Sequence, residues 1–346
     1  MNDPADLKEL LAEAAVSPAQ VSLTVEHPVA PKAVPATAEV PHTSGLTVEF
    51  KGCGQSFADD SGMREVVKNI TFKAEGTETI AILGPSGCGK STILRMVSGM
   101  YPRETLMPTV GQCLINGEEV TGPRDEVLTV WQQAVLCPWM SILGNVMLSF
   151  KPSIYGVRTR WPWEVLQDMA AAVGDRFEAT RHKIPCSTPH KEIEQRAIAI
   201  LEAVGLADSM HKFPGQLSGG MLQRAAMAAS LVVRPEILCM DEPFSALDPT
   251  TRVEMRNLVK TLKKLYPCII LFVTHDVGEA LDLADRVLVM STRPATILSD
   301  IKLPPQAERT AEWAGSSEHA RLETTILQTI REANTTSGAG NLRVSV

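Results

Sequence analysis

The sequence predicts an α/β fold built on a mainly parallel sheet, and two observations indicate it. Four short apolar runs, rich in β-branched residues, have the length and composition of strands that are buried on both faces of a sheet. Segments with helical periodicity lie between them, and strands that alternate with helices are typical of a parallel sheet. The four strand-like runs are residues 78–84, 236–241, 268–274 and 286–290.

Further elements flank and connect these strands. Residues 46–52 and 65–72 alternate between apolar and polar side chains, as strands with one solvent-facing side do. The C-terminal part, 305–346, predicts a short helix from Glu318 to Glu332 followed by a loose tail. The expected helices between the strands are residues 91–100, 220–233, 249–265 and 277–285.

Two segments are harder to assign than the rest of the chain. Residues 1–44 combine a short helical pattern with a linker rich in Pro, Ala and Val, which predicts either a docking helix on a tether or a frayed end. Residues 151–190 contain one helix-like run at 163–173 among Pro-broken stretches. His182, Cys186 and His190 recur every four residues there, but the intervening prolines break a helix, so an ordinary surface loop is favoured over a metal site.

Composition excludes several classes of protein. The 346 residues carry a formal net charge of −7, which argues against a nucleic-acid partner. The seven cysteines are scattered without a C-x-x-C pair, which disfavours disulfide scaffolds and zinc ribbons and suits a reducing cytosol. The N-terminal residues lack the pattern of a secretory signal, and no apolar run reaches about 18 residues. Any membrane role is therefore expected to act through a partner.

The most specific motif is a phosphate-binding loop at residues 84–91, Gly-Pro-Ser-Gly-Cys-Gly-Lys-Ser. Its glycines let backbone N–H groups converge on phosphate oxygens, and the helix that follows directs its positive N-terminus at the same anion. Lys90 adds a charge for the β- and γ-phosphates, and the Ser91 hydroxyl is placed to coordinate Mg²⁺. The motif predicts that a nucleoside triphosphate binds here.

Two carboxylates follow a buried strand at residues 236–240. Asp241 at the end of that strand is suited to hold Mg²⁺ or its water, and Glu242 is suited to polarise an attacking water molecule. An acidic loop after a strand is also common in proteins without this chemistry. The phosphate loop elsewhere in the chain favours the catalytic interpretation.

Four further motifs resemble those of one family, the ATP-binding cassette (ABC) ATPases. The family's order and spacing are kept across about residues 46–300. The resemblance implies a P-loop NTPase fold with a RecA-like core, an antiparallel β subdomain and a helical subdomain. The four motifs are the signature at 217–221 (Leu-Ser-Gly-Gly-Met), the D-loop at 245–248, the switch-histidine segment at 274–276 and the Q-loop Trp131-Gln132.

The resemblance also implies domain limits. The ATPase domain is expected at 45–304, with a helical subdomain at about 134–222 that contains the insertion 151–190. The N-terminal extension is then 1–44 and the C-terminal tail 305–346. Met221, Trp131 and Ala229 depart from the residues that are commonest in the family, and none of the three departures is expected to abolish catalysis.

By resemblance, two copies or paired cassettes bind ATP head to tail, between the phosphate loop of one and the signature of the other. The catalytic residues would be Glu242, His275, Gln132 and Lys90, and Mg²⁺ would be held by Ser91, Gln132 and Asp241. Phe57 would stack on adenine, although core packing is an alternative. The nucleotide-binding residues would be Phe57, Gly84, Pro85, Ser86, Gly87, Cys88, Gly89, Lys90, Ser91, Thr92, Ser218, Gly219, Gly220 and Asp248.

Residues 136–146 and 283–294 resemble one branch of the family, the importers for nitrate, sulfonate, taurine and related anions. That branch implies an ATPase that uses ATP and Mg²⁺ at the cytoplasmic face of the inner membrane. Its partners would be a separate transmembrane permease and, indirectly, a solute-binding protein. The alternatives are a soluble ABC ATPase without a transport role, an exporter ATPase, a catalytically dead regulatory module and a P-loop kinase.

Overall fold

The structure is a computed structural model that describes residues 45–59, 62–101, 108–124, 126–149, 190–233, 235–265 and 267–338. The expected N-terminal helix and linker lie outside the described residues, as do the helix-like run at 163–173 and the side chains of the His182, Cys186 and His190 trio. Within the described ranges, no helix combines the length and the apolar composition that crossing a membrane would need.

A six-stranded sheet forms the centre of the molecule, in the strand order β10-β9-β3-β8-β7-β6. Five of its strands run parallel, and β10 pairs antiparallel with β9 at one edge. The four strand-like runs of the sequence are confirmed as β3, β7, β8 and β9. The strands are β3 (Thr79–Leu83), β6 (Val127–Val130), β7 (Ile237–Asp241), β8 (Ile269–Val273), β9 (Arg286–Met290) and β10 (Ile297–Lys302).

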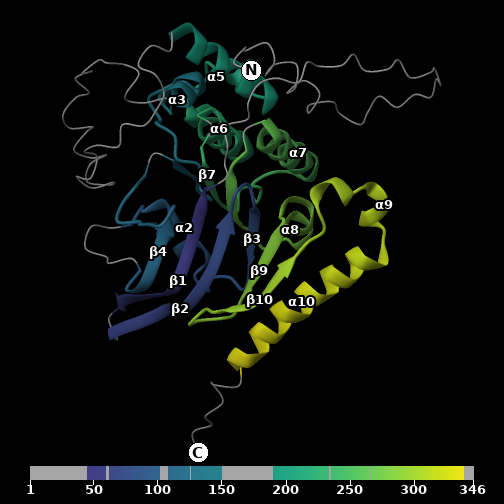
Figure 1. The fold of residues 1–346 in the computed structure, drawn as a ribbon. Coiled ribbons are helices and arrows are strands. Elements are labelled where there is room, and N and C mark those ends of the chain that lie inside the picture. The colour runs from purple at the N-terminus through teal and green to yellow at the C-terminus, as the bar shows by residue number, and fades with distance from the viewer. Residues whose placement is uncertain are drawn as a thin grey trace, which may run out of the picture.

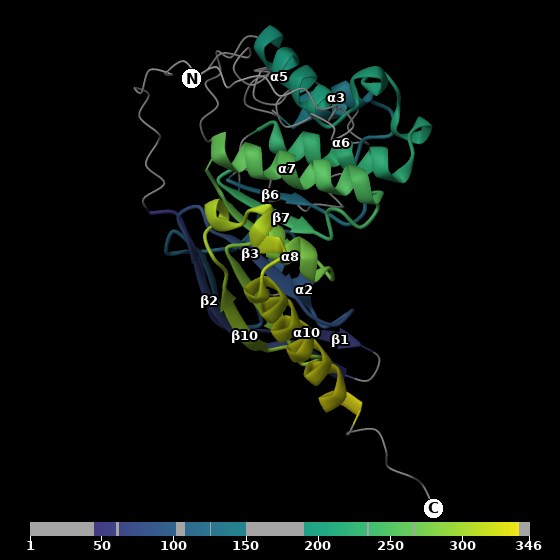
Figure 2. The same cartoon turned by 90° about the vertical axis from the view of Figure 1, so that its right-hand side faces the viewer.

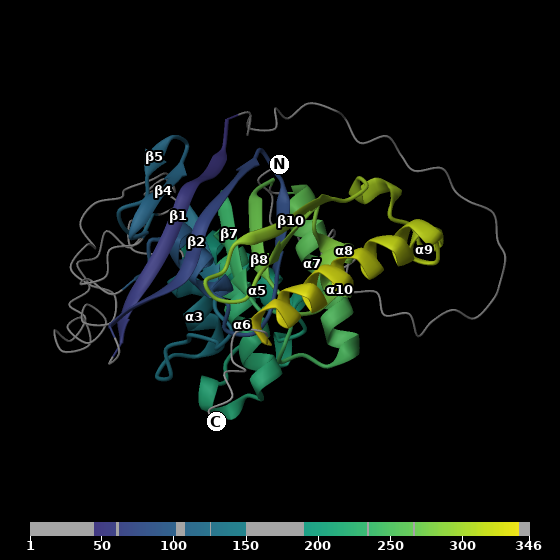
Figure 3. The same cartoon turned by 90° about the horizontal axis from the view of Figure 1, so that it is seen from below.

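Alternate side chains of these strands enter two different cores. On one face, Ile80, Cys239 and Leu271 pack with α2 (Lys90–Ser98) and with a second, antiparallel sheet. On the other face, Ala81 and Phe272 join a core with the remaining helices. The central sheet is therefore covered on both sides, which is why its strands are apolar throughout. Figure 3 shows the three layers, with the antiparallel sheet on one side and α7, α8 and α10 on the other.

The antiparallel sheet has the order β2-β1-β4-β5. Its two long strands contain the alternating segments that the sequence analysis identified, and both extend beyond them. Phe50 and Phe72 stack at 4.6 Å between ring centroids and anchor its inner face. The strands are β1 (Thr47–Asp59), β2 (Gly62–Glu75), β4 (Val110–Ile115) and β5 (Glu118–Glu119).

Three helices, α3, α5 and α6, pack against one another at the end of the molecule away from the antiparallel sheet (Figure 1). Ser141 caps the first of them by accepting a hydrogen bond from Gly144 N. The Asn145 side chain binds the backbone of Cys137 and so fixes the segment that enters α3. The bounds are α3 (Ile142–Leu148), α5 (His190–Ala203), η1 (Ala207–Ser209), η2 (Pro214–Gln216) and α6 (Gly219–Leu231).

The remaining helices cover the other side of the central sheet. The C-terminal helix crosses β9 and α8 (Figure 2) and buries Ile326 and Ala333. It extends beyond the expected 318–332, because residues 333–337 contain neither Gly nor Pro and Gly338 ends it. The bounds are α7 (Pro249–Leu265), α8 (Val277–Leu283), η3 (Gln306–Glu308), α9 (Ala311–Ala314) and α10 (Ser317–Gly338).

Gly99 ends α2 with φ +64°, in the left-handed conformation that favours glycine. A Cβ at this position would lie 2.0 Å from the carbonyl oxygen of Gly122 and 2.7 Å from Pro123 N. Gly117, in the turn between β4 and β5, has φ +80°, and a Cβ added there would meet nothing within 4 Å. A substitution of Gly117 therefore reports the cost of the backbone conformation alone, whereas a substitution of Gly99 adds the cost of a steric clash.

We expect Gly117→Ala to lower the free energy of unfolding by about 1 kcal/mol, since only the left-handed conformation is penalised. Gly99→Ala should lower it by about 3 kcal/mol, because the methyl group also displaces the backbone at 122–123. Urea denaturation followed by circular dichroism measures both values. Equal losses for the two variants would contradict the predicted clash.

Candidate functional site

The phosphate loop joins β3 to α2, and its lysine is folded into it. Lys90 Nζ donates hydrogen bonds to the carbonyl oxygens of Gly84, at 2.8 Å, and Pro85, at 2.9 Å. The side chain is only 6% exposed. The ammonium group is therefore held by the loop itself, at the mouth of the cavity into which the loop faces.

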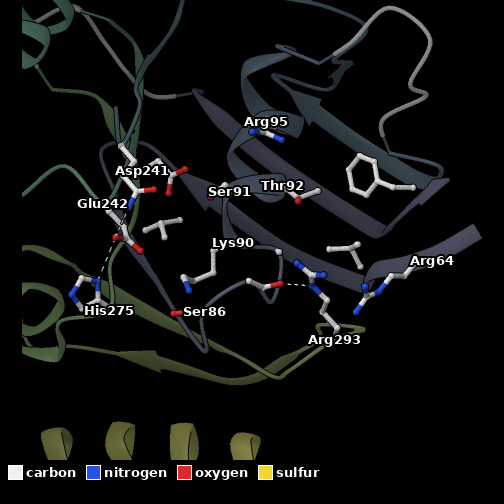
Figure 4. Close-up of a pocket in the computed structure, with 16 residues that line it drawn as sticks. Arg64, Ser86, Lys90, Ser91, Thr92, Arg95, Asp241, Glu242, His275 and Arg293 are labelled. Carbon is white, nitrogen blue, oxygen red and sulfur yellow. Dashed lines mark hydrogen bonds and ion pairs between the residues drawn. The ribbon is translucent and has the colours of Figure 1, made fainter. Parts of the chain in front are cut away.

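Polar side chains follow three more strands at the same edge of the sheet. Gln132 comes shortly after β6, and His275 shortly after β8. Asp241 is the last residue of β7, and Glu242 follows it. Parallel strands bring their carboxyl ends to one edge, so residues far apart in the chain meet. Gln132 Nε2 donates to Glu242 Oε2 at 3.2 Å, and His275 Nδ1 lies 3.5 Å from the same oxygen. Figure 4 shows His275 joined to Glu242 at this end of the cavity.

Asp241 is the most buried carboxylate of the group, at 7% exposure. Burial raises its pKa above the usual value, while a hydrogen bond from Ser91 opposes the shift. A hydroxyl and a carboxylate that already contact each other are two oxygen donors of the kind that Mg²⁺ prefers. The residues present therefore fit a magnesium ion at this position.

Glu242 has an unusual backbone, with φ +46° in a non-glycine residue. Its N–H donates to Val273 O at 2.9 Å, and its carbonyl accepts from Ser245 Oγ at 2.9 Å. This conformation costs about 1–2 kcal/mol, and such strain is retained mainly where the surrounding structure imposes it, often at functional sites. It turns the Glu242 side chain into the cavity, beside Gln132 and His275.

The cavity has a volume of about 880 Å³ and brings together residues from both sheets and from α2. Many of its lining residues were predicted from the sequence. These are Phe57, Ser86, Gly87, Gly89, Lys90, Ser91, Thr92, Gln132, Asp241, Glu242 and His275. Lining residues that the sequence analysis missed are Arg64, Val66, Arg95, Val273 and Arg293.

Three loop residues that were expected to bind nucleotide do not line the cavity. Gly84 and Pro85 turn their carbonyl groups to Lys90, and Cys88 is buried in the core below the loop, at 2% exposure. Burial also raises the pKa of the Cys88 thiol, so this side chain acts as a small apolar group. Any contact of Gly84 or Cys88 with a nucleotide would therefore use a backbone N–H group, which Pro85 lacks.

The signature and D-loop residues also lie away from the cavity of their own chain. Ser218 caps α6, where its hydroxyl oxygen accepts a hydrogen bond from Met221 N at 3.4 Å. Asp248 caps α7 through Thr251 N at 3.1 Å, and hydrogen bonds with Thr251 lower its pKa. Ser218, Gly219 and Asp248 are exposed. They face outward on the surface of this chain.

A buried amide links the signature helix to the Q-loop. Gln223, on α6 and 2% exposed, donates from Nε2 to Trp131 O at 3.3 Å, next to Gln132. Arg95 lies over the Trp131 ring at 5.9 Å. Arg95 is four residues after Ser91 on α2, and this i, i+4 spacing was the sequence signal that could have identified it.

Comparison with known proteins places this arrangement in a family. The model of the family described as ABC transporter matches residues 67–245, which contain the phosphate loop and both carboxylates. Nitrate transport protein NasD of Klebsiella oxytoca is 32% identical over 288 residues, covering 82% of this chain and 96% of NasD. Taurine import ATP-binding protein TauB of Roseobacter denitrificans is 35% identical, covering 69% of this chain and 75% of TauB.

A bicarbonate transport ATP-binding protein, CmpD of a Synechocystis strain, is 34% identical and covers 76% of this chain and 80% of its own length. Among solved structures, the dimeric post-hydrolysis state of the ATP-binding cassette MJ0796, bound to ADP and Pi, matches with a TM-score of 0.58 and 25% identity. The match covers 75% of this chain and 99% of that one. The predicted cassette fold is thus confirmed, and the chain belongs to the ABC transporter family as one of its ATP-binding subunits.

Proposed function

We propose that this chain is the ATP-hydrolysing subunit of an importer for small anions and that it acts on a separate membrane permease. The observation that carries the proposal is the meeting of Lys90, Asp241, Glu242, Gln132 and His275 in one cavity. A phosphate cradle beside a carboxylate that can activate water is the arrangement that triphosphate hydrolysis needs.

Each residue at the phosphate end of the cavity has a proposed task. Lys90 and the backbone of the loop bind the β- and γ-phosphates, and His275 contacts the γ-phosphate. Glu242 accepts a proton from the attacking water, while Gln132 orients its carboxylate. Mg²⁺, held by Asp241 and Ser91 with Gln132 near them, would neutralise charge on the phosphates.

The active unit is proposed to be a head-to-tail pair of cassettes. In this chain the N-terminus of α6 and its Ser218 face outward, so they are available to the nucleotide of a second copy. A helix N-terminus that meets an anion supplies backbone donors and a favourable dipole. The dimeric state of the related cassette MJ0796 supports the same arrangement.

An exposed apolar patch supports docking to a permease. Val135 is 77% exposed, Trp139 54% and Phe213 47%. Val135 and Trp139 lie on one segment and Phe213 on another. The two segments are neighbours, because Ile142 N donates a hydrogen bond to Lys212 O at 2.9 Å. Exposed apolar groups on neighbouring segments between a catalytic loop and the helices α3 and α6 favour a protein interface. We therefore propose that this patch binds the permease at the cytoplasmic face of the inner membrane.

The class of solute is proposed from the relatives. Their names are those of nitrate, bicarbonate and taurine transport proteins, and all three solutes are small and carry an anionic group. A solute-binding protein would deliver such a solute to the permease. We propose 45–304 as the ATPase domain, about 134–222 as its helical subdomain, 1–44 as an extension and 305–346 as a C-terminal tail that contains α10.

Glu242→Gln should keep ATP binding and lower the rate of hydrolysis by about 10³-fold, because the amide cannot accept a proton from water. Glu236→Gln is the matched control, since Glu236 is an exposed carboxylate immediately before the opposite end of the same strand. Phosphate release and nucleotide affinity are measured for both. If the Glu242 variant hydrolyses ATP at a rate within about tenfold of that of the unchanged protein, Glu242 is not the general base.

Val135→Asp should lower binding to membranes that contain the permease by at least about tenfold, because a charge would be buried at the interface. The control is Val110→Asp, which places the same charge at a valine of 66% exposure on β4. Sedimentation of each variant with membrane vesicles from permease-expressing cells measures the bound fraction. Equal binding of the two variants would argue against the patch as the docking surface.

A further inference from the structure

Two arginines line the nucleotide cavity at the end away from Asp241 and Glu242. Arg64 comes from β2, and Arg293 comes from the turn between β9 and β10. Within the described ranges, no carboxylate contacts either guanidinium group. Figure 4 shows both side chains on the same side of the cavity, beyond Lys90 and the phosphate loop.

The backbone brings the two arginines together. The turn that contains Arg293 is bound to β2, because Ala295 N donates to Val66 O and Lys68 N donates to Ala295 O, each at 2.9 Å. Ala295 pairs in parallel with Val67, so Arg293 and Arg64 lie two and three residues before the paired positions. Arg64 and Val66 share one face of β2, and both line the cavity. The pairing therefore holds two positive charges at one end of the site.

Their position along the cavity is fixed by two neighbours. Arg293 Nε donates to the carbonyl oxygen of Gly87, within the phosphate loop. Arg64 is the register partner of Phe57 in the β1–β2 ladder, and Phe57 also lines the cavity. The two guanidinium groups thus lie between the phosphate loop and the aromatic ring that the family resemblance assigns to the base.

Two like charges that lack a carboxylate partner repel each other, and an anion bound between them would offset this repulsion. The other cations that line the cavity lie in the phosphate loop and near Asp241. Lys90 is held by loop carbonyl groups, and Arg95 lies over Trp131 and interacts electrostatically with Asp241. Among the described residues that line the cavity, the cations at the Arg64 end are therefore Arg64 and Arg293. Guanidinium groups favour phosphate oxygens because their N–H donors match them in pairs.

We propose that Arg64 and Arg293 form a clamp for the α-phosphate of the bound nucleotide. This inference rests on the proposed function, since it places the nucleotide with its base at Phe57 and its outer phosphates at Lys90. The α-phosphate is present in ATP, ADP and AMP alike. The clamp therefore sets the affinity for all three and does not distinguish the substrate from the product.

The test is the dissociation constant of each nucleotide for Arg64→Gln and Arg293→Gln, measured by calorimetry on the full chain. Each variant should raise the dissociation constants of ATP, ADP and AMP by the same factor, about tenfold, as expected for the loss of a charged hydrogen bond. Lys68→Gln is the matched control, because Lys68 is an exposed cation of the same strand outside the cavity lining. It should change each constant less than about twofold.

Two outcomes would overturn the clamp. One is an affinity that stays within about twofold for all three nucleotides, and the other is a loss for ATP alone, which would assign the arginines to the γ-phosphate. The melting temperature without nucleotide reports whether each variant folds. Arg64→Gln should not lower it, whereas Arg293→Gln also loses the hydrogen bond to Gly87 O. If the unchanged chain binds no ATP, the proposed function itself fails. If it binds ATP and the arginine variants match it, only the clamp fails.

Discussion

The parallel pairing of β6, β7, β8 and β3 is the constraint on which the rest of the site depends. It brings four carboxyl ends to one edge of the sheet, so that the phosphate loop, Gln132, Asp241 and His275 arrive at one cavity from distant parts of the chain. The two cores on either face hold these strands in place, with Phe272 on one side and Leu271 on the other. Small shifts of the sheet would therefore change all catalytic distances together.

The cavity at this edge of the sheet has acidic side chains at one end and basic side chains at the other. Burial of Asp241 raises its pKa, and Ser91 partly compensates by hydrogen bonding. Glu242 keeps a strained backbone that directs it to Gln132 and His275. At the other end of the cavity the charge is positive and comes from Arg64 and Arg293. The charge distribution is thus complementary to that of the proposed metal-bound triphosphate, with acids where the metal would lie and cations along the phosphates.

Sequence reasoning located the residues that meet in the cavity where they lie within one short segment. The phosphate loop and the Asp241–Glu242 pair are contiguous motifs, and buried strands such as 268–274 are visible as apolar runs. Arg64 and Arg293 were missed because their meeting depends on the β1–β2 register and on the pairing of Ala295 with β2. Neither relation is visible in a single sequence. The length of α10 was underestimated because the Asn, Thr and Ser residues at 334–337 are weak helix formers, and intrinsic propensity is a weak guide to where a helix ends.

The outward position of Ser218 has a mechanistic consequence if the cassettes pair as proposed. One chain supplies the loop, the carboxylates and the arginines, but its own α6 N-terminus cannot reach its own cavity. Closure of the site then requires a second copy, and the nucleotide links the two. The Gln223 side chain bonds α6 to the backbone of Trp131, beside Gln132. A movement of the signature helix would therefore shift the Q-loop and the nearby Val135. The hydrogen bond from Gln223 to Trp131 O is therefore one link between nucleotide-driven closure and the proposed permease patch.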